Sequence, residues 1–371
     1  MKVALLTNFI PPYRKSLYSA LNDNLSELTI FISQEMEKNR DWKVDHGDLN
    51  VVVQKAIRYS KKWRSEHSKN YKSIVQIPYD TFFKLRKNNP DIVISVEMGI
   101  RSLLASLYCL IYKKPLLIWL ALSEHSEKDK KGLRILLRKF ILKRASGVFC
   151  NGKSAERYVR SLGCDKKVFF VPCTSDFKLV TNRQKNNQNK TVLLTGQLIE
   201  RKGILETAKA LQLWANANNS VDINLIVAGD GPKKKVLQEL SCLPNIDLRL
   251  LGAVPYNEMQ KLYTQSDIYL FPTLGDEWGV VVNEALASGL PVLGSIYSQA
   301  AIELIDSENG WTFQPDNEKV FLEALTNAID TPNEKLHLMG QSGVKKMQGY
   351  TAKIVSKNIH NALIYVSKHY K

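Results

Sequence analysis

The chain has 371 residues, of which 44% are hydrophobic and 24% are charged. This length exceeds what one hydrophobic core usually fills, so two domains are expected, and the composition excludes a disordered or low-complexity protein. The formal charge of +16 lies entirely in the first half: residues 1–175 contain 32 Lys and Arg against 16 Asp and Glu, whereas residues 176–371 contain 20 of each. The positive electrostatic field of such a basic half attracts polyanions, namely nucleic acid, anionic lipid headgroups or diphosphate-bearing substrates.

The five cysteines are odd in number and widely spaced: Cys109, Cys150, Cys164, Cys173 and Cys242. No CxxC motif or Cys/His cluster is present, so a zinc site or a disulfide framework is not expected, and buried free thiols are predicted. The chain opens without a charged and then apolar leader, and its longest apolar region, residues 103–112, is too short to span a bilayer. A cytoplasmic protein is expected.

Short apolar runs that are typical of strands alternate with helix-like segments through both halves of the chain. The first half contains such runs at residues 3–7, 28–33, 92–96, 116–119, 147–151 and 168–171, and the second half at 192–195, 223–228, 248–251, 267–271 and 291–294. This alternation predicts an α/β fold with parallel sheets built from βαβ units. Residues 178–190 are polar and aperiodic, and a domain boundary is expected there. Because open parallel sheets bind ligands beyond the carboxyl ends of their strands, a site in a cleft between the halves is expected.

Two segments of the first half contain candidate binding residues. The helical pattern at residues 8–21 begins with two prolines, whose rigid φ angles fix the backbone, and Tyr13 and Arg14 follow them. Both residues are candidates for binding an anionic group. The equally plausible alternative is that they are ordinary surface residues. The run LALSEHSE, residues 120–127, contains His125, and a lone histidine is more often structural than functional.

Residues 130–144 combine an apolar stripe with basic residues. The stripe consists of Leu133, Leu136, Leu137, Phe140 and Ile141, and the flanking cations are Arg134, Arg138, Lys139, Lys143 and Arg144. This composition is typical of a helix that lies on a membrane surface. It is equally typical of a core helix with a basic outer face, and the sequence leaves both interpretations open.

The first strand of the second half is followed by TGQLIERKGI, residues 195–204. A glycine turn at the end of a strand, with Arg201 and Lys202 a few residues later, can place a planar fork and a point charge against a pyrophosphate. The alternative for Lys202 alone is a solvated loop lysine. Further along, GDGP at residues 229–232 predicts a turn between a strand and a helix, and turn geometry is a sufficient explanation for its glycines.

The most informative stretch is FPTLGDEWGVVVNEALASGLPVLG, residues 271–294. It joins a strand end, a glycine turn and a helix predicted at residues 279–288, with Asp276 and Glu284 eight positions apart. The amides of a first helical turn carry partial positive charge and can hold a diphosphate. Glu284 can accept two hydrogen bonds from a ribose diol, and Asp276 can meet sugar hydroxyls. Taken singly, these carboxylates have a second interpretation as an N-capping Asp and a solvent-facing Glu.

This stretch resembles the donor-sugar signature of the retaining glycosyltransferases of family 4, which have the GT-B fold of two Rossmann-like domains with parallel sheets facing a central cleft. The family pattern is a Glu, seven intervening residues and a second Glu, and here Asp276 stands at the first position, with Glu277 beside it as the alternative. The resemblance is dense over residues 191–314 and sparse before them. It implies that Asp276 orients the sugar and that Glu284 binds the ribose. It also implies a donor site lined by Glu277, Trp278, Gly279, Val280 and Val281.

The same resemblance assigns roles to the other motifs. The turn at residues 195–204 resembles the family's phosphate-binding turn, with Gly196 followed by Gln197 where an Arg often stands, and with Arg201 and Lys202 at the diphosphate. The loops that contain Gly229 and Val254 are implied to flank the nucleotide.

In the first domain, His125 or its neighbour Glu124 is implied to lie near the donor sugar, and Tyr13 and Arg14 are implied to lie near the acceptor. The implied organisation is an acceptor domain at residues 1–175, a donor domain at 176–350 and a helix at 351–371 that returns to the first domain.

No Asp-x-Asp pair occurs in the chain. Metal-dependent transferases of the other large fold use such a pair to hold a divalent ion on the diphosphate. Here the helix amides with Lys202 and Arg201 are expected to neutralise the leaving diphosphate, and no metal or other cofactor is expected.

The resemblance implies a retaining transferase that moves a sugar from a nucleoside diphosphate sugar to a hydroxyl acceptor. UDP is the expected nucleotide, and the expected acceptor is a glycan or lipid-diphosphate-linked molecule in polysaccharide or cell-surface glycan assembly. The basic first half predicts peripheral association with the anionic inner face of the plasma membrane. One alternative is a nucleotide-sugar hydrolase or epimerase on the same scaffold. The other is a nucleic-acid-binding protein, which is disfavoured because no aromatic residues interleave with the basic runs in a recognisable module, so no nucleic-acid partner is expected.

Overall fold

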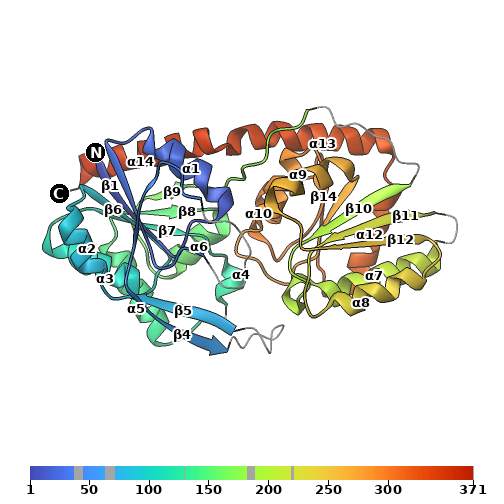
Figure 1. The fold of residues 1–371 in the computed structure, drawn as a ribbon, viewed down its shortest axis with the longest axis horizontal. Helices are drawn as coiled ribbons and strands as arrows, with labels where there is room; N and C mark the ends of the chain where they lie inside the picture. Colours follow the sequence, from blue (N-terminus) through green and yellow to red (C-terminus); the bar gives the residue numbers. More distant parts are fainter. Residues whose placement is uncertain (37–44, 63–71, 129, 182–188, 219–220, 371) are drawn as a thin grey trace. The chain divides into compact units, whose positions relative to one another are not determined.

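The structure is a computed structural model of the chain and describes residues 1–36, 45–62, 72–128, 130–181, 189–218 and 221–370. The described chain divides into two compact units, which are coloured along the sequence in Figure 1: one contains the chain up to Asp176 together with its last part from Tyr350, and the other contains residues 177–349. Each unit has its own parallel sheet flanked by helices, so the predicted α/β fold class is confirmed. Of the predicted linker at residues 178–190, residues 182–188 lie outside the described part of the chain.

The first unit is built on a seven-stranded parallel sheet with the strand order β3-β2-β1-β6-β7-β8-β9. The strands predicted in this half are all present: β1 (Lys2–Thr7), β2 (Glu27–Ile32), β6 (Ile92–Val96), β7 (Leu116–Leu120), β8 (Gly147–Cys150) and β9 (Val168–Phe170). The sequence did not predict the edge strand β3 (Asn50–Val53) or the antiparallel pair β4 (Ala56–Lys62) and β5 (Lys72–Pro78). No residue of β3 is fully buried, so the strand lacks the continuous buried run that marks the inner strands.

Alternate residues of the first sheet enter two hydrophobic cores, one on each face, which is why its strands read as continuous apolar runs. In β1, Ala4 and Leu6 belong to one core, whereas Val3 and Leu5 belong to the other. The first core is covered by α2 (Thr81–Asn88), α3 (Ile100–Ile111), α5 (Leu133–Arg144) and α6 (Lys153–Ser161), and the short helix α4 (Glu124–Glu127) follows β7. The second core is covered by α1 (Pro12–Asn22) and the C-terminal helix α14 (Ala352–His369), which pack against each other.

Helix α5 differs from the single apolar stripe that the sequence predicts. Ile141 is buried, but three of the other stripe residues are exposed: Leu133, Leu136 and Phe140. Arg138 instead turns inward, because its guanidinium pairs with the Glu127 carboxylate and the Tyr158 hydroxyl. The helix therefore packs on the core by a narrow face and presents apolar side chains to solvent.

The second unit is built on a six-stranded parallel sheet with the strand order β12-β11-β10-β13-β14-β15. The predicted strands are present: β10 (Lys190–Thr195), β11 (Ile223–Ala228), β12 (Ile246–Gly252), β13 (Ile268–Phe271) and β14 (Val292–Ser295). The edge strand β15 (Gly310–Phe313) was not predicted. The helices and 3-10 turns are η1 (Glu200–Lys202), α7 (Ile204–Ala217), α8 (Lys234–Gln238), η2 (Glu239–Cys242), α9 (Tyr256–Gln265), α10 (Val280–Ala287), α11 (Gln299–Leu304), α12 (Glu318–Asp330), α13 (Asn333–Met347) and η3 (Gln348–Tyr350).

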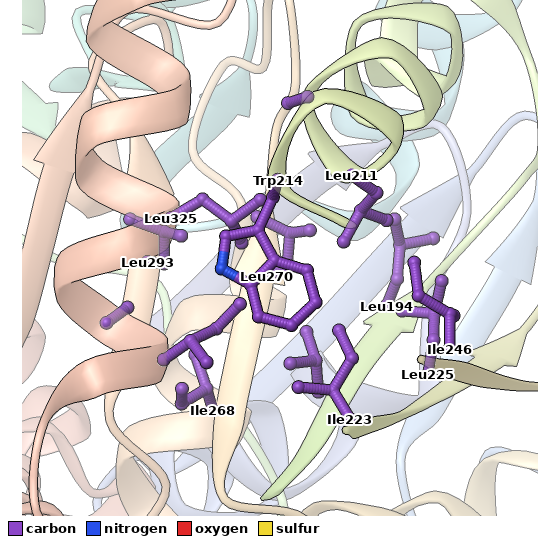
Figure 2. Packing of buried hydrophobic residues seen from close by; sticks show 14 of the residues in the cluster. Leu194, Leu211, Trp214, Ile223, Leu225, Ile246, Ile268, Leu270, Leu293 and Leu325 are labelled. Atoms are coloured by element: carbon purple, nitrogen blue, oxygen red, sulfur yellow. The ribbon is translucent and has the colours of Figure 1, made fainter. Parts of the chain in front are cut away.

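Trp214 of α7 lies at the centre of the core on one face of the second sheet. Figure 2 shows its indole among side chains of the sheet and of α12, including Ile223, Ile268, Leu270 and Leu325, and Trp214 is fully buried. An aromatic side chain of this size contributes strongly to a core. It fixes α7 against the sheet, and thereby fixes the turn that connects β10 to α7.

The strand order of each sheet reverses once, between β1 and β6 in the first sheet and between β10 and β13 in the second. At such a switch point the crossover connections lead to opposite faces, and the loops beyond the carboxyl ends of the two strands are where open parallel sheets bind ligands. In the second sheet these loops are residues 196–203 and 272–279, which lie in the two segments that the sequence singles out.

All five cysteines are free thiols, and Cys109, Cys150, Cys164 and Cys173 are buried as predicted. The prediction is wrong for Cys242, which is exposed because it ends the short surface turn η2. In the part of the chain that the structure covers, no helix combines the length and the apolar character needed to cross a membrane.

Candidate functional site

The candidate site lies at the switch point of the second sheet, where the loop after β13 leads into α10. Gly279 is the N-cap of α10, and its φ of 97° lies in the left-handed region. A Cβ at this position would lie 2.6 Å from the Ser298 Oγ and 2.7 Å from the Phe271 Cε1, so only glycine fits. The helix therefore begins abruptly, and the first-turn amides, which include those of Val280 and Val281, have no partner within the helix and carry partial positive charge.

The loop after β10 lies against the loop after β13. Gly203, which ends η1 with a φ of 70°, approaches Pro272 so closely that a Cβ would lie 1.9 Å from the Pro272 carbonyl oxygen. The Leu274 amide donates to the Arg201 carbonyl at 2.9 Å, and the Arg201 Nη1 donates to the Gly275 carbonyl at 2.6 Å. This main-chain contact holds the two cations of η1 over the loop after β13.

Asp276 lies between those cations. Its Oδ2 accepts a hydrogen bond from the Lys202 Nζ at 2.6 Å, and the Arg201 Nη1 lies 3.7 Å away. Burial acts to raise the pKa of Asp276, but the charges of Lys202 and Arg201 outweigh it, together with hydrogen bonds from Lys202 and the Trp278 amide, and hold the pKa below its ordinary value of 3.8. Asp276 is thus an ionised hydrogen-bond acceptor at neutral pH, and it is not the N-cap of α10. Asp276 contacts both Lys202 and Arg201, and the neighbouring Glu277 is exposed.

Glu284 is buried within α10, with 6% of its surface exposed, so it is not the solvent-facing residue of the alternative interpretation. Its Oε2 accepts a hydrogen bond from the Tyr263 hydroxyl at 3.1 Å. The Tyr263 hydroxyl lies 3.3 Å from the Thr195 Oγ1, which lies 2.8 Å from the Tyr269 hydroxyl. Burial, with added effects of Tyr269 and Glu284, raises the pKa of Tyr263 well above its ordinary value, so the phenol keeps its proton and donates it.

Sequence reasoning missed Tyr263, Tyr269 and Thr195. Both tyrosines stand in the apolar patterns of α9 and β13, where an aromatic residue is ordinarily part of a core, and nothing in the sequence marks their hydroxyls as partners of a carboxylate. The structure also shows that both Asp276 and Glu284 act to raise the pKa of Tyr269, although burial is the main cause. The two carboxylates of the sequence pattern therefore lie within electrostatic reach of one tyrosine.

The side chain of Trp278 is buried and stabilises the fold around the site. Its side chain is 3% exposed, and its Nε1 donates to the Asn283 Oδ1 at 2.8 Å. Its carbonyl accepts a hydrogen bond from the Ala300 amide at 2.9 Å. Only the main-chain amide of Trp278, which contacts Asp276, reaches the candidate site.

Three loops meet through glycines at the carboxyl edge of β10, β11 and β12. A Cβ on Gly229 would lie 1.8 Å from the Gly196 carbonyl oxygen, and Gly229 forms an isolated antiparallel bridge with Gly252. Gly196 itself has a φ of 119°. Gln197 and Val254 continue the first and third of these loops, and both are half-buried. The structure thus gathers four predicted residues at one edge, and the glycine at 229 is required by close main-chain approach as well as by turn geometry.

In the first unit, Tyr13 and Arg14 lie in the first turn of α1, whose N-cap is Pro11. The Arg14 guanidinium lies 5.3 Å from the centre of the Trp119 ring, and its Nη1 donates to the Tyr18 hydroxyl at 3.3 Å. Arg14 is therefore held over an aromatic surface instead of extending into solvent.

His125 is half-buried in α4. The start of this short helix is fixed by a capping box between Ser123 and Ser126. The neighbouring Glu124 accepts a hydrogen bond from the Arg157 Nε at 2.7 Å, so its carboxylate is engaged in an exposed ion pair.

Over the described residues, no group of three or more His, Cys, Asp or Glu side chains is arranged to hold a metal ion. That the site works without a metal stays a prediction.

Comparison with known proteins shows which family the second unit is similar to and which fold the whole chain has. Residues 176–346 match the family of glycosyl transferases group 1, and this stretch contains the loops after β10 and β13 that form the candidate site in the second unit. The fold matches that of a sucrose-phosphate synthase from Thermosynechococcus elongatus with a TM-score of 0.72 and 14% identity, over 98% of both chains. It also matches HepE from Anabaena in complex with UDP, with a TM-score of 0.69 and 16% identity, over 98% of this chain and 100% of that one. The chain therefore has the GT-B fold.

Among sequence relatives, a GDP-mannose-dependent alpha-mannosyltransferase of Corynebacterium glutamicum is 30% identical over 132 residues, which are 36% of this chain and 29% of that protein. The aligned stretches cover less than half the length of the curated relatives that the chain matches, from 46% to 29% for the first three. The relationship therefore covers only part of the chain and does not identify its substrates.

Proposed function

We propose that this protein transfers a sugar from a UDP-sugar to a hydroxyl group of a glycan or lipid-linked acceptor, with retention of the anomeric configuration, as a member of glycosyltransferase family 4. The observation that carries the proposal is the contact of Lys202 and Arg201 with Asp276 beside the start of α10. Two cations, a helix N-terminus and a carboxylate suit a ligand that combines a diphosphate with a polyol. UDP is chosen because HepE, which shares the fold, has been solved with UDP and with UDP-glucose.

Each residue of the site has a defined role in this proposal. The diphosphate lies on the first-turn amides of α10 and attracts Lys202 and Arg201. The ionised Asp276 accepts hydrogen bonds from hydroxyls of the sugar. Glu284, whose Oε2 accepts a hydrogen bond from Tyr263, accepts hydrogen bonds from the ribose diol. The nucleobase contacts main-chain groups of the glycine loops.

The reaction needs no nucleophile from the protein. The acceptor oxygen attacks the anomeric carbon on the face from which the diphosphate leaves, so that a glycosidic bond forms as the bond from that carbon to the phosphate oxygen breaks. The proton of the acceptor hydroxyl passes to the departing phosphate oxygen, and the products are a glycoside and a nucleoside diphosphate. Preorganised amides and the two cations stabilise the charge on the leaving group without a metal, so a chelator should leave turnover unchanged.

A thermal-shift panel of UDP, GDP and ADP, followed by their sugars, tests the donor site. We expect UDP to raise the Tm, because a ligand that binds only the folded state stabilises it. Glu284→Ala should abolish this shift, raise the donor KM and lower turnover by more than about tenfold, because it removes charged hydrogen bonds to the ribose. Glu318→Ala, at an exposed position of α12, is the matched control.

Several outcomes would contradict the proposal. Kinetics of Glu284→Ala that equal those of the unmodified protein would remove the ribose assignment. A shift with GDP alone would change the nucleotide. Hydrolysis or epimer formation without any acceptor would favour the alternative reaction on the same scaffold.

We also propose that the first unit lies on the anionic cytoplasmic face of the plasma membrane, where a lipid-diphosphate-linked acceptor would be found. Helix α5 exposes apolar side chains next to exposed cations: Leu133, Leu136 and Phe140 with Arg134, Lys139, Lys143 and Arg144. Helix α3 packs against α5 and exposes Leu110 and Ile111. Apolar side chains can enter the headgroup boundary while the cations meet anionic lipids.

Sedimentation with vesicles tests this placement. The protein should bind vesicles that contain phosphatidylglycerol and not those of phosphatidylcholine alone, and salt should release it. Replacing Leu133 and Leu136 together by Ser should weaken binding, whereas Leu338→Ser, at a 63% exposed position of α13, should not. A protein that stays in the supernatant with anionic vesicles at low salt would overturn the placement.

A further inference from the structure

The switch point of the first sheet carries a polar cluster that the proposed donor site does not use. Asn8 follows β1, Ser33 follows β2 and Glu97 follows β6, and these three strands are neighbours in the sheet. Because the carboxyl ends of parallel strands meet at one edge, the three residues lie together. They stand at the place in the first sheet that corresponds, by strand order, to the place of Lys202 and Asp276 in the second.

Hydrogen bonds join these residues to a buried arginine. The Asn8 Nδ2 donates to the Glu97 Oε1 at 3.2 Å, and the Asn8 Oδ1 accepts from the Arg101 Nη2 at 2.5 Å. The same Nη2 lies 2.5 Å from the Ser33 Oγ. The Asn8 amide is therefore fixed in one orientation between a guanidinium and a carboxylate.

Arg101 is a buried member of this hydrogen-bond network. It is the second residue of α3 and is 6% exposed, and its buried Nε has no hydrogen-bond partner in the described part of the chain. Burial lowers the pKa of Arg101 to about 10, with Glu97 acting in the opposite direction, so the guanidinium keeps its charge at neutral pH. A buried charge is tolerated when it is paired and hydrogen-bonded, and here Asn8 and Ser33 bond it while the Glu97 carboxylate provides the opposite charge.

Glu97 is exposed and adopts a backbone conformation that glutamate rarely takes. Its φ is 68°, in the left-handed region, which disfavours residues other than glycine. The conformation is held by a hydrogen bond from its amide to the Trp119 carbonyl at 2.9 Å and by the Ser102 Oγ, which donates to the Glu97 carbonyl at 2.5 Å. Glycine would satisfy this backbone without strain, so the backbone conformation does not explain why a glutamate stands here. Strained residues of this kind gather at functional sites.

The chemistry of the cluster selects the ligand. The exposed group is a carboxylate whose Oε1 already accepts from Asn8, and a carboxylate accepts hydrogen bonds and repels phosphates. We propose that Glu97, positioned by Asn8 and Arg101, binds hydroxyl groups of a neutral, hydroxyl-rich ring, and that this ring is the sugar of the acceptor. Glu97 is the contacting residue, and Asn8 and Arg101 act through it. The identification of the ring as an acceptor rests on the proposed sugar transfer, whereas the binding of a neutral polyol at Glu97 does not.

Ligand-observed saturation-transfer NMR with the full chain and saturating UDP tests the proposal, with methyl α-D-glucopyranoside, N-acetylglucosamine and myo-inositol as probes. Glu97→Gln removes the charge and keeps the size and the backbone strain, and Glu97→Gly releases the strain as well. Lys113→Gly is the matched control, because Lys113 is exposed, has a φ of 51° and follows the other end of α3. At least one probe should give a signal with the unmodified protein and with Lys113→Gly, and both Glu97 variants should weaken it roughly tenfold or more.

Stability separates a binding role from a structural one. Lys113→Gly should raise the Tm because it replaces a strained residue by glycine, and Glu97→Gly should have a higher Tm than Glu97→Gln because both lose the charge opposite Arg101 and only the glycine variant loses the strain. UDP should shift the Tm of every variant equally. A lower Tm for Glu97→Gly than for Glu97→Gln, a signal that persists in Glu97→Gln, displacement of the probes by inorganic phosphate, or no signal from any probe would each overturn the proposal. If UDP still binds in those cases, the proposed donor site is supported and only the proposed role of Glu97 is refuted.

Discussion

Replacing Asp276 by Asn should strengthen the binding of UDP while it removes sugar transfer. The Asp276 carboxylate lies 2.6 Å from the Lys202 Nζ and 3.7 Å from the Arg201 Nη1. A diphosphate that approaches these two cations meets the repulsion of the carboxylate and must share its partners. Asparagine keeps the shape of the side chain and removes its charge, so both cations become available to the phosphates.

The size of the effect follows from Coulomb's law. Two unit charges on the order of 6 Å apart interact by roughly 3 kcal/mol at an effective dielectric constant of about 20. The Asp276 side chain is 22% exposed, so solvent and ions screen part of this repulsion. We expect UDP to bind about 1 to 2 kcal/mol more tightly, which is about 5- to 30-fold in Kd.

Isothermal titration with UDP measures this difference at low and at physiological salt. Asp276→Asn should bind more tightly than the unmodified protein, Lys202→Met should bind more weakly, and the gain should shrink as salt is added. Asp306→Asn is the control, because Asp306 forms a comparable pair with Lys346 at 2.5 Å on other elements of the same unit. Turnover with a UDP-sugar should fall in Asp276→Asn despite the tighter binding, because the sugar loses a charged acceptor.

Equal or weaker binding of UDP by Asp276→Asn would refute this reasoning. It would show that the carboxylate does not oppose the diphosphate, and that Lys202 and Arg201 hold something other than phosphates.

Three further predictions concern stability and reactivity. Gly203→Ala should lower the free energy of unfolding by about 3 kcal/mol or more in denaturant titrations, because its Cβ would lie 1.9 Å from the Pro272 oxygen at a φ of 70°; an unchanged midpoint would contradict the close loop contact. Because the pKa of Asp276 is lowered on folding, its stabilisation is present above the unfolded value of 3.8 and is lost as the pH falls through the folded value. The difference in Tm between the unmodified protein and Asp276→Asn should therefore persist between about pH 5 and 8 and disappear below about pH 4. A difference that vanishes near neutral pH would count against the ion pair of Asp276 with Lys202. A thiol reagent should modify the exposed Cys242 rapidly. Burial raises the pKa of Cys109 to about 12, so Cys109 should react only on unfolding. Rapid modification of Cys109 in the folded protein would contradict its burial.

The strands and the glycine-containing loops after β10 and β13 could be predicted because local rules determine them. Both faces of each sheet are covered, so the inner strands are continuous apolar runs, and Gly203 and Gly279 mark places where only glycine fits the backbone. The edge strands β3 and β15 escaped prediction because part of their surface lies in solvent and neither has such a run, although the edge strands β9 and β12 were predicted.

The contacts between distant residues could not be predicted from the sequence. Asp276 and Lys202 are 74 positions apart, and their pairing depends on β10 and β13 being neighbours, which no local pattern states. The hydroxyl of Tyr263 is a comparable case, because its partner Glu284 lies on a different helix. In α5, Arg138 turned inward because Glu127 and Tyr158 receive it, and the amphipathic pattern alone gives no sign of those partners.

The contact of the glycine loops after β10, β11 and β12 has a consequence for how this protein can be redesigned. Gly196, Gly229 and Gly252 hold one another through main-chain atoms, so the geometry of this edge is independent of the side chains that stand beside them. A mutant library that varies Gln197 and Val254 and keeps the three glycines should alter nucleotide preference while the proteins still fold. The main chain of these loops therefore keeps its shape, and the side chains beside the glycines can be changed without altering it.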